Sequence, residues 1–273
     1  MGPSAKSVLL ELLVAARGQS LPVRLAVVAC ELFDISENNV RVAIVRLSSS
    51  GLIVAAGRGL YRLGPGAEGI AREVSSFRTV EKRLRSWNGG WIAVHVGALS
   101  RSDRTVLRRR ARSLSLLGFA ELERGLHVRP DNLDGGVEDV RARLRGLGLD
   151  ERANVFAASA FDADVDARAR ALWDGKALTQ SYRKTRTEIE RWLRQAGRLE
   201  TDVAAREAFL LGGRGIRQVV YDPLLPPPLV DVEERHAFVR AVVEMDGEGR
   251  KIWQRFFREN ALAASEDFSA SIH

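Results

Sequence analysis

Residues 35–51 read ISENNVRVAIVRLSSSG, and this stretch decides the fold of the N-terminal part of the chain. Ser36 is a good N-cap residue, and Glu37 follows it in the first turn, where a negative charge is favoured. Ile35, just before the cap, can pack on Val40 as a hydrophobic staple. Three serines and a glycine end the pattern. We therefore predict a helix that begins after Ser36, with an inward face made by Val40, Ala43, Ile44 and Leu47.

Two shorter amphipathic patterns precede this helix. In the first, which Gly18 ends, one face carries Leu9, Leu12, Leu13 and Ala16. The second starts after Ser20 with Pro22 near its first turn, and its apolar stripe consists of Leu25, Val28, Ala29 and Leu32. Both patterns predict helices that bury one side.

A hairpin is predicted directly after the third helix. Residues 52–56 and 59–63 favour short strands, and Gly57-Arg58 between them suits a tight connection. Three helices followed by a hairpin is the element order of a winged helix-turn-helix. We assign this DNA-binding domain to residues 1–66.

The middle of the chain has a different pattern. A helix over 67–85 belongs to a linker, residues 67–88, which ends at the glycine break of Trp87-Asn88-Gly89-Gly90-Trp91. The following elements have the order βαββαβ of a ferredoxin-like domain, which we place in residues 89–160. They are a strand at 91–96, a helix at 103–117, strands at 119–122 and 126–128, a helix at 137–147 and a strand at 154–158.

The remaining residues, 161–273, favour a mainly helical effector or dimerisation domain. A proline run at residues 226–228 divides this part, and the glycine-rich stretch Gly212-Gly213-Arg214-Gly215 predicts a helix stop. The longest pattern places on one face Tyr182, Ile189, Trp192, Leu193 and Ala196. The fold class is therefore α+β, with three successive domains.

Composition restricts the class of protein. Of 273 residues, 45% are hydrophobic and 28% are charged, which is typical of a folded globular chain. A formal net charge of +7 favours an acidic partner, either nucleic acid or anionic lipid. Cys30 is the single cysteine, so no intramolecular disulfide can form, and we expect it to act as a small buried hydrophobe. Without a signal-peptide or membrane-span pattern, a cytoplasmic protein that binds no membrane is expected.

The outward side of the third helix carries the strongest functional signal. In a helix-turn-helix the exposed face of the second motif helix enters the major groove and reads base edges. Asparagine amides can pair with bases, arginines can reach guanine or phosphate, and valine can contact a thymine methyl group. The candidate DNA-binding residues are Asn38, Asn39, Arg41, Val42, Val45 and Arg46 on this helix, with Arg58 and Arg62 on the wing. Alternatively, the module serves only protein contacts and these side chains are merely solvated.

A second basic group lies on the expected helix of the middle domain. It consists of Arg101, Arg104, Arg108, Arg109, Arg110 and Arg112. These arginines can bind phosphates of DNA or of a nucleotide-bearing effector. Alternatively, they form a solvated helix face, and we give this interpretation equal weight. Consecutive residues on a helix cannot all face one ligand.

Neither a metal site nor a catalytic triad is expected, and no cofactor is implied. The histidines His95, His127, His236 and His273 are dispersed, and no two have the spacing of metal ligands on one helix face.

The sequence resembles the phenylacetic acid degradation repressor (PaaX) family along essentially its whole length. The N-terminal part is similar through 35–41 and 46–52. The middle part resembles that family's Cas2-like ferredoxin-fold domain through 87–91, 116–119 and 125–130. The C-terminal part is similar through Arg217 and the segment 221–226, although Pro228-Leu229-Val230-Asp231 stands where the family usually has a tryptophan-bearing turn.

The resemblance implies a homodimeric repressor of an aromatic-compound or other catabolic operon. Such a repressor binds an inverted-repeat operator in double-stranded DNA and is released by a small molecule, which in the best-known members is phenylacetyl-coenzyme A. The candidate residues for an effector such as an acyl-coenzyme A are Arg108, Arg109, Arg112, Arg217 and Tyr221.

Two rival functions stay open. One is a nuclease, because the middle domain resembles a fold that in some relatives cuts nucleic acid with a metal-bound aspartate at the end of the first strand. Here that stretch is Val94-His95-Val96-Gly97-Ala98, which has no carboxylate for a hard cation. The other is a non-DNA-binding scaffold or sensor that uses the winged helix for dimerisation. We therefore expect a regulator rather than an enzyme.

Overall fold

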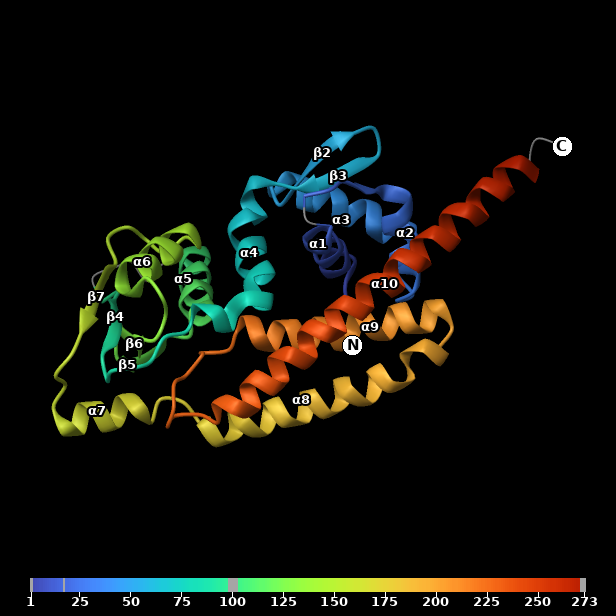
Figure 1. Ribbon diagram of the computed structural model, residues 1–273. Coiled ribbons are helices and arrows are strands. Elements are labelled where there is room, and N and C mark those ends of the chain that lie inside the picture. Colours follow the sequence, from blue (N-terminus) through green and yellow to red (C-terminus); the bar gives the residue numbers. More distant parts are fainter. Residues whose placement is uncertain (1, 17, 98–102, 271–273) are drawn as a thin grey trace. The chain divides into compact units, whose positions relative to one another are not determined.

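The computed structural model describes residues 2–16, 18–97 and 103–270, with side chains up to residue 261 (Figure 1). Numerous helices accompany two antiparallel sheets, so the predicted α+β class is confirmed. Within this described part of the chain, no helix is long and apolar enough to cross a membrane.

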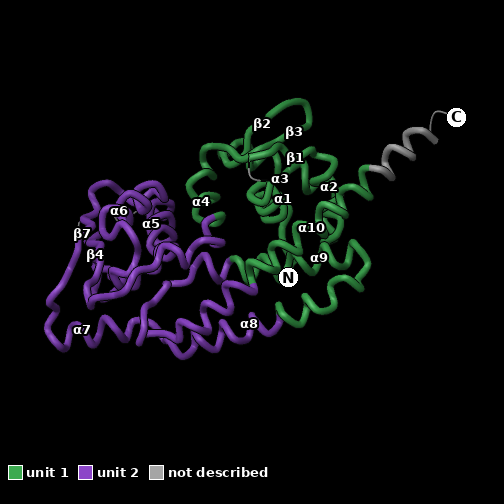
Figure 2. Tube along the Cα trace, viewed as in Figure 1, with its two compact units in different colours: residues 1–75, 189–216, 242–273 green, residues 76–188, 217–241 purple. Residues whose placement is uncertain are grey.

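The chain forms two compact units (Figure 2). Unit 1 contains residues 1–75, 189–216 and 242–273, and unit 2 contains residues 76–188 and 217–241. The C-terminal helices therefore contribute residues to both units.

Unit 1 begins with three short helices and a hairpin, in the predicted order. The hairpin strands pair antiparallel, and Leu21–Pro22 adds a third strand that the sequence patterns did not predict. These elements are α1 (Ala5–Ala15), β1 (Leu21–Pro22), α2 (Val23–Glu31), α3 (Glu37–Ser49), β2 (Ile53–Gly57) and β3 (Leu60–Leu63).

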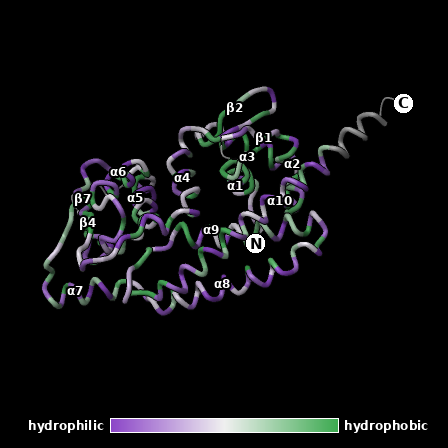
Figure 3. The backbone as a smooth tube through the Cα atoms, viewed as in Figure 1, coloured by the Kyte–Doolittle hydropathy of each residue, from purple (hydrophilic) through white to green (hydrophobic). Residues whose placement is uncertain are grey.

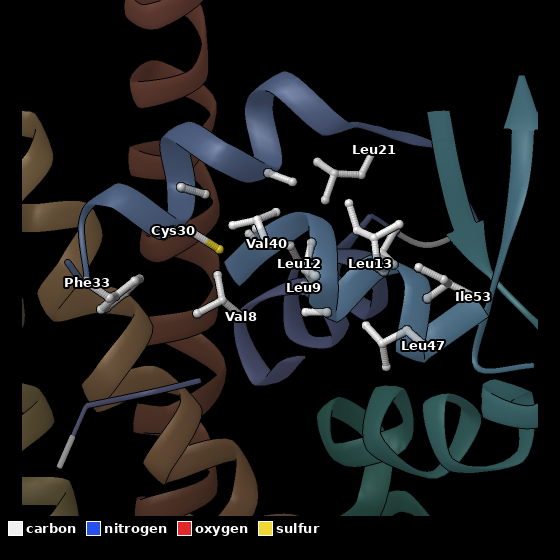
Figure 4. Close-up of a cluster of buried hydrophobic side chains, with 14 residues drawn as sticks. Val8, Leu9, Leu12, Leu13, Leu21, Cys30, Phe33, Val40, Leu47 and Ile53 are labelled. Carbon is white, nitrogen blue, oxygen red and sulfur yellow. The ribbon is translucent and has the colours of Figure 1, made fainter. Parts of the chain in front are cut away.

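Helix α3 forms as its sequence predicts. The Ser36 hydroxyl accepts a hydrogen bond from the Asn39 backbone N–H at 3.4 Å, so the predicted N-cap is confirmed. The four residues of the predicted inward face are all buried. They join one hydrophobic core with α1 and α2, where Figure 4 shows Val8, Cys30 and Val40 close together.

The predicted apolar stripe of α2 is wrong in part. Its buried residues are Ala26, Ala29 and Cys30, whereas Val28 and Leu32 are only half-buried. Both sides of this helix are used: the small residues pack against α1 and α3, and Val28 and Leu32 line a cavity with α9 (Thr201–Val220) and α10 (Val232–Ala270). Periodicity alone could not divide the apolar residues between two partners.

Cys30 is fully buried, as expected, and burial raises the pKa of its thiol to about 11. Since the thiolate is the reactive form, a shift of this size lowers its population at pH 8 by about 100-fold. We expect an aromatic disulfide reagent to modify the native protein at least about 100-fold more slowly than protein in guanidinium chloride. Equal rates in the two conditions would show that Cys30 is accessible.

The helix predicted over 67–85 is not continuous. Helix α4 (Pro65–Ser75) ends at a serine pair and a 3-10 helix, η1 (Ser76–Arg83), follows. A side-chain hydroxyl that bonds a backbone carbonyl of the same turn competes with helical hydrogen bonding. Here the Ser76 carbonyl accepts from the Thr79 hydroxyl at 3.3 Å, and the Arg83 guanidinium donates to the Ser76 hydroxyl at 3.3 Å.

The helix stop predicted at residues 212–215 is also wrong, because α9 runs through it. A Cβ atom on Gly215 would lie 3.1 Å from Val242 and 3.3 Å from Ile189. The glycine therefore allows α9 to approach α10 and α8 (Gly175–Gln195) closely. Hydrophobic and hydrophilic residues alternate along α8 (Figure 3). The predicted face is buried at Tyr182, Ile189 and Trp192 of α8 and at Ala196 of the next element, η2. Leu193 on the same face is only half-buried.

Unit 2 contains a four-stranded antiparallel sheet with the order β5-β6-β4-β7. The central strand β4 is buried on both faces from Trp91 to Val94, and Trp91 pairs with Pro130 on one side and Ala158 on the other. The elements are β4 (Trp91–His95), α5 (Arg104–Leu116), β5 (Ala120–Glu123), β6 (Leu126–Pro130), α6 (Gly136–Gly146) and β7 (Asn154–Ala158), followed by α7 (Ala163–Arg170).

Candidate nucleic-acid interface

Helix α3 exposes the face opposite its buried residues. All six candidate residues of this helix are exposed, including the apolar side chains Val42 and Val45, at 40% and 64%. Their exposure is imposed by the core, because burial of Val40, Ala43, Ile44 and Leu47 turns the other side outward. The face combines amides, methyl groups and guanidiniums, which are the groups that read base edges and phosphates.

The two arginines of this face differ in their partners. The Arg41 Nε atom donates to Glu37 Oε1 at 2.8 Å, in an ion pair whose side chains are both more than half exposed. Such surface ion pairs contribute little to stability, so Arg41 can leave Glu37 for an external anion at a small cost in free energy. No carboxylate of the described residues pairs with Arg46.

The hairpin adds two further exposed cations. Arg58 lies in the turn between β2 and β3, and Arg62 lies on β3. Neither guanidinium has an ion-pair partner within the described part of the chain. Both are therefore available to an external anion.

The arginine group of the middle domain is only partly at the surface. Arg104, Arg108, Arg109 and Arg112 are exposed on α5, whereas Arg110 is buried at 7% exposure and belongs to the interior. Arg101 lies outside the described residues.

The predicted effector residues come from two elements of unit 2, α5 and the C-terminal end of α9. Arg217 and Tyr221 are exposed at the C-terminal end of α9, one helical turn apart. No hydrogen bond or ion pair among the described residues joins them to the arginines of α5. The effector assignment stays a prediction.

A cavity of about 590 Å³ lies within unit 1, between α2 and the helices α9 and α10. Four carboxylates and one arginine contribute to its lining, so an anionic acyl-coenzyme A would meet unfavourable charge there. Its lining residues are Val28, Glu31, Leu32, Glu200, Thr201, Asp202, Val203, Arg206, Phe256, Glu259 and Asn260.

The described residues hold no group of three or more His, Cys, Asp or Glu side chains placed to bind a metal ion. His95 ends β4 with an exposed side chain, while Ala98 and His273 lie outside the described residues. Burial lowers the pKa of His127, which favours its neutral form.

Comparison with known proteins decides the family. Residues 4–65 match the family described as PaaX-like protein, and residues 173–255 match the PaaX-like protein C-terminal domain. Together these matches cover more than half of the chain. The chain belongs to the PaaX-like family. This is a family of transcriptional regulators, so the predicted regulator class is confirmed at that level.

A solved structure shares the fold of this PaaX-like protein. The uncharacterized protein Rv0674 from Mycobacterium tuberculosis is 25% identical, with a TM-score of 0.57. The similarity covers 92% of this chain and 98% of that chain. No curated protein matches at a significant level.

Sequence reasoning missed a buried polar cluster in unit 2 of the PaaX-like protein. Arg129 is 1% exposed, and its guanidinium donates to the carbonyls of Leu117 and Pro130 and to Asn132 Oδ1. Asn132 Nδ2 in turn donates to the Leu224 carbonyl at 2.7 Å. Burial lowers the pKa of Arg129, which has neutral oxygens as its direct partners.

This cluster joins three of the motifs that carry the family resemblance. Arg129 bonds Leu117 in the stretch 116–119 and also Asn132, and Asn132 bonds Leu224 in the distant stretch 221–226. These hydrogen bonds tie the three stretches together inside unit 2. The signal available in the sequence was an arginine and an asparagine flanking Pro130 at the end of a buried strand.

Three more buried polar groups lie near the same segment. The Arg235 Nη1 atom donates to the Leu225 carbonyl at 2.6 Å, and Asp222 Oδ1 accepts from the Leu224 N–H at 2.7 Å. Burial raises the pKa of Asp222, and nearby Tyr182 and Arg235 partly oppose that shift. These groups hold the connection between α9 and α10 in place.

Gly118 offers a test of this packing. Its φ is +69°, and an added Cβ would lie 2.6 Å from Pro223 Cα. We expect Gly118→Ala to lower the free energy of unfolding by about 3 kcal/mol, from backbone strain and overpacking together. Gly89→Ala is the matched control, since Gly89 has φ +88° and open space around it. Equal losses in chemical denaturation would show that the Pro223 contact contributes nothing.

Proposed function

We propose that this PaaX-like protein is a sequence-specific DNA-binding regulator that represses a catabolic operon. In this proposal residues 1–66 act as a winged helix-turn-helix, and α3 enters the major groove of an operator. The support is the outward face of α3, which presents Asn39, Val42 and Arg46 to solvent opposite a fully buried side. Those side chains suit adenine, the thymine methyl group and guanine.

The remaining candidate residues have positioning roles. Asn38, Arg41 and Val45 lie beside the reading face, where they meet flanking base edges and phosphates. Arg58 and Arg62 on the wing contact the adjacent backbone or minor groove. Their exposure and lack of ion-pair partners within the described residues support this.

The protein acts as a homodimer on an inverted repeat. Two copies of α3 then enter successive major grooves about 34 Å or a multiple of that distance apart. The linker 67–88, a Cas2-like ferredoxin domain at 89–160 and the helical part at 161–273 carry dimerisation and effector response. A small molecule that binds one domain arrangement better than the other lowers operator affinity.

Selection of bound genomic fragments tests this function. The full-length protein should enrich fragments that share one inverted repeat, and binding should fall when either half-site is scrambled. Repeating the selection with a panel of acyl-coenzyme A thioesters identifies a releasing effector. Enrichment of fragments without any common sequence would contradict the proposal.

A further inference from the structure

Helix α5 carries a row of three arginines on its exposed side. Arg104, Arg108 and Arg112 follow one another at intervals of four residues and are all exposed. The orientation of α5 is fixed by its opposite side, where Ser113 and Leu114 are buried. We refer to these three residues as the arginine row.

The arginine row has no internal counter-charge. None of its guanidiniums pairs with a carboxylate of the described residues, whereas neighbouring arginines of α6 do: Arg141 pairs with Glu138, and Arg143 with Asp139. Like charges four residues apart on a helix repel one another. The row therefore retains an unfavourable repulsion that an external polyanion would relieve.

The carboxylate closest in sequence to the row is occupied elsewhere. Asp103 caps α5, and its Oδ1 atom accepts from the backbone N–H groups of Thr105 and Val106 at 2.7 and 3.2 Å. Its side chain thus serves the helix terminus rather than the arginines. The surface along the row stays cationic.

The dimensions of the row match a nucleic-acid strand. Arg104 and Arg112 are eight positions apart, which corresponds to about 12 Å along a helix. Along about 12 Å of duplex axis, one DNA strand presents about three or four phosphates. The planar guanidinium fork binds phosphate oxygens in pairs.

From these observations, and resting on the proposed function, we infer that the arginine row binds backbone phosphates of the operator as a second DNA contact. It adds affinity without base preference. This assigns Arg108 and Arg112 to DNA in place of a small-molecule effector. Arg109 is set apart, because its side chain packs against Gly148 after α6.

The form of the surface argues against a small ligand. Small-molecule sites are concave and enclose most of the ligand surface. The row lies on the exposed side of a helix, and none of its residues lines the cavity of unit 1. An extended partner fits such a face better than a compact one.

Salt-dependent operator binding tests the row. In the variant Arg104→Gln/Arg108→Gln/Arg112→Gln, the slope of log affinity against log salt should flatten by up to about 2.7, or about 0.9 for each phosphate that the variant no longer neutralises. Discrimination between operator and scrambled duplex should not change. The control removes the same charge from α8 and η2 (Ala196–Arg198), as Arg191→Gln/Arg194→Gln/Arg198→Gln; all three arginines are exposed.

The outcomes separate this inference from the function on which it rests. A slope equal to that of the wild type, or equal to that of the control, overturns the row as a DNA contact. If the row variant binds the operator like the wild type but is no longer released by acyl-coenzyme A, the row binds an effector. This result also overturns the row as a DNA contact. The protein could instead bind duplexes without sequence preference, with a salt slope that is still flatter in the row variant. That result would reject the operator function but retain the arginine row as a DNA contact. Unfolding curves of both variants must match the wild type.

Discussion

Replacing Asn39 and Arg46 with alanine is expected to reduce operator affinity by about 30-fold or more. A bidentate contact between a side chain and a base contributes about 1–3 kcal/mol of discrimination, so removing two of them amounts to about 2–6 kcal/mol. Both side chains are exposed, and the Asn39 N–H that Ser36 caps belongs to the backbone and survives the change. Stability should therefore change by less than about 0.5 kcal/mol. Fluorescence anisotropy with a labelled operator measures the reduced affinity.

The control for this experiment uses the same residue types elsewhere. Asn154 on β7 and Arg198 in η2 are exposed, and Asn154→Ala/Arg198→Ala should bind the operator like the wild type. The effect in the α3 variant should also depend on sequence, being smaller on non-specific duplex. If the α3 variant and the wild type bound the operator equally well, α3 would not be the recognition helix.

The second large effect is expected from Arg129→Met, which should lower the free energy of unfolding by about 2–4 kcal/mol. The change leaves the carbonyls of Leu117 and Pro130 and the Asn132 amide oxygen without their donor, inside the protein. Each buried acceptor left unsatisfied costs about 1–3 kcal/mol, and relief of the buried charge offsets part of the sum. Denaturation followed by tryptophan fluorescence reports the change, because Trp87 and Trp91 lie in the same unit.

Arg124→Met serves as the comparison, since Arg124 is exposed in the turn between β5 and β6. It should change stability by less than about 0.5 kcal/mol. A decrease below about 1 kcal/mol for Arg129→Met would mean that water replaces the missing donor. In that case the cluster would not hold the segment 222–225.

Local signals allowed much of the fold to be predicted from the sequence. The start of α3 depends on Ser36 and its neighbours, and its inward face on spacing alone, so the exposed side followed directly. Glycines mark the turns between β2 and β3 and between β5 and β6. In each case the deciding residues lie within one element or in the turn beside it.

The break between α4 and η1 is local, whereas the other wrong predictions concern contacts between distant segments. Gly215 suggests a helix break in the sequence, but in the structure it makes room for Val242 and Ile189. The sequence of α2 suggests one apolar stripe, but the helix packs against partners on two sides. The hydrogen bond between Asn132 and Leu224 joins residues 92 positions apart, which no periodic pattern records. Within α5, spacing could have separated Arg110 from the exposed arginines, because a continuous basic run cannot face one side.

The core of unit 1 has a consequence for how the regulator can change its target. Phe33, beside α2, lies 5.0 Å from the ring of Phe209 on α9, and that ring lies 6.1 Å from Trp253 on α10. A fragment cut after residue 75 would lose Phe209 and Trp253 and expose Phe33 and its apolar neighbours to water, which favours aggregation. Exchange of residues 1–75 for the corresponding segment of a relative would likewise disturb the packing of these aromatic rings. New operator preferences are therefore expected to arise by single substitutions on the outward face of α3, one base pair at a time, rather than by recombination of modules.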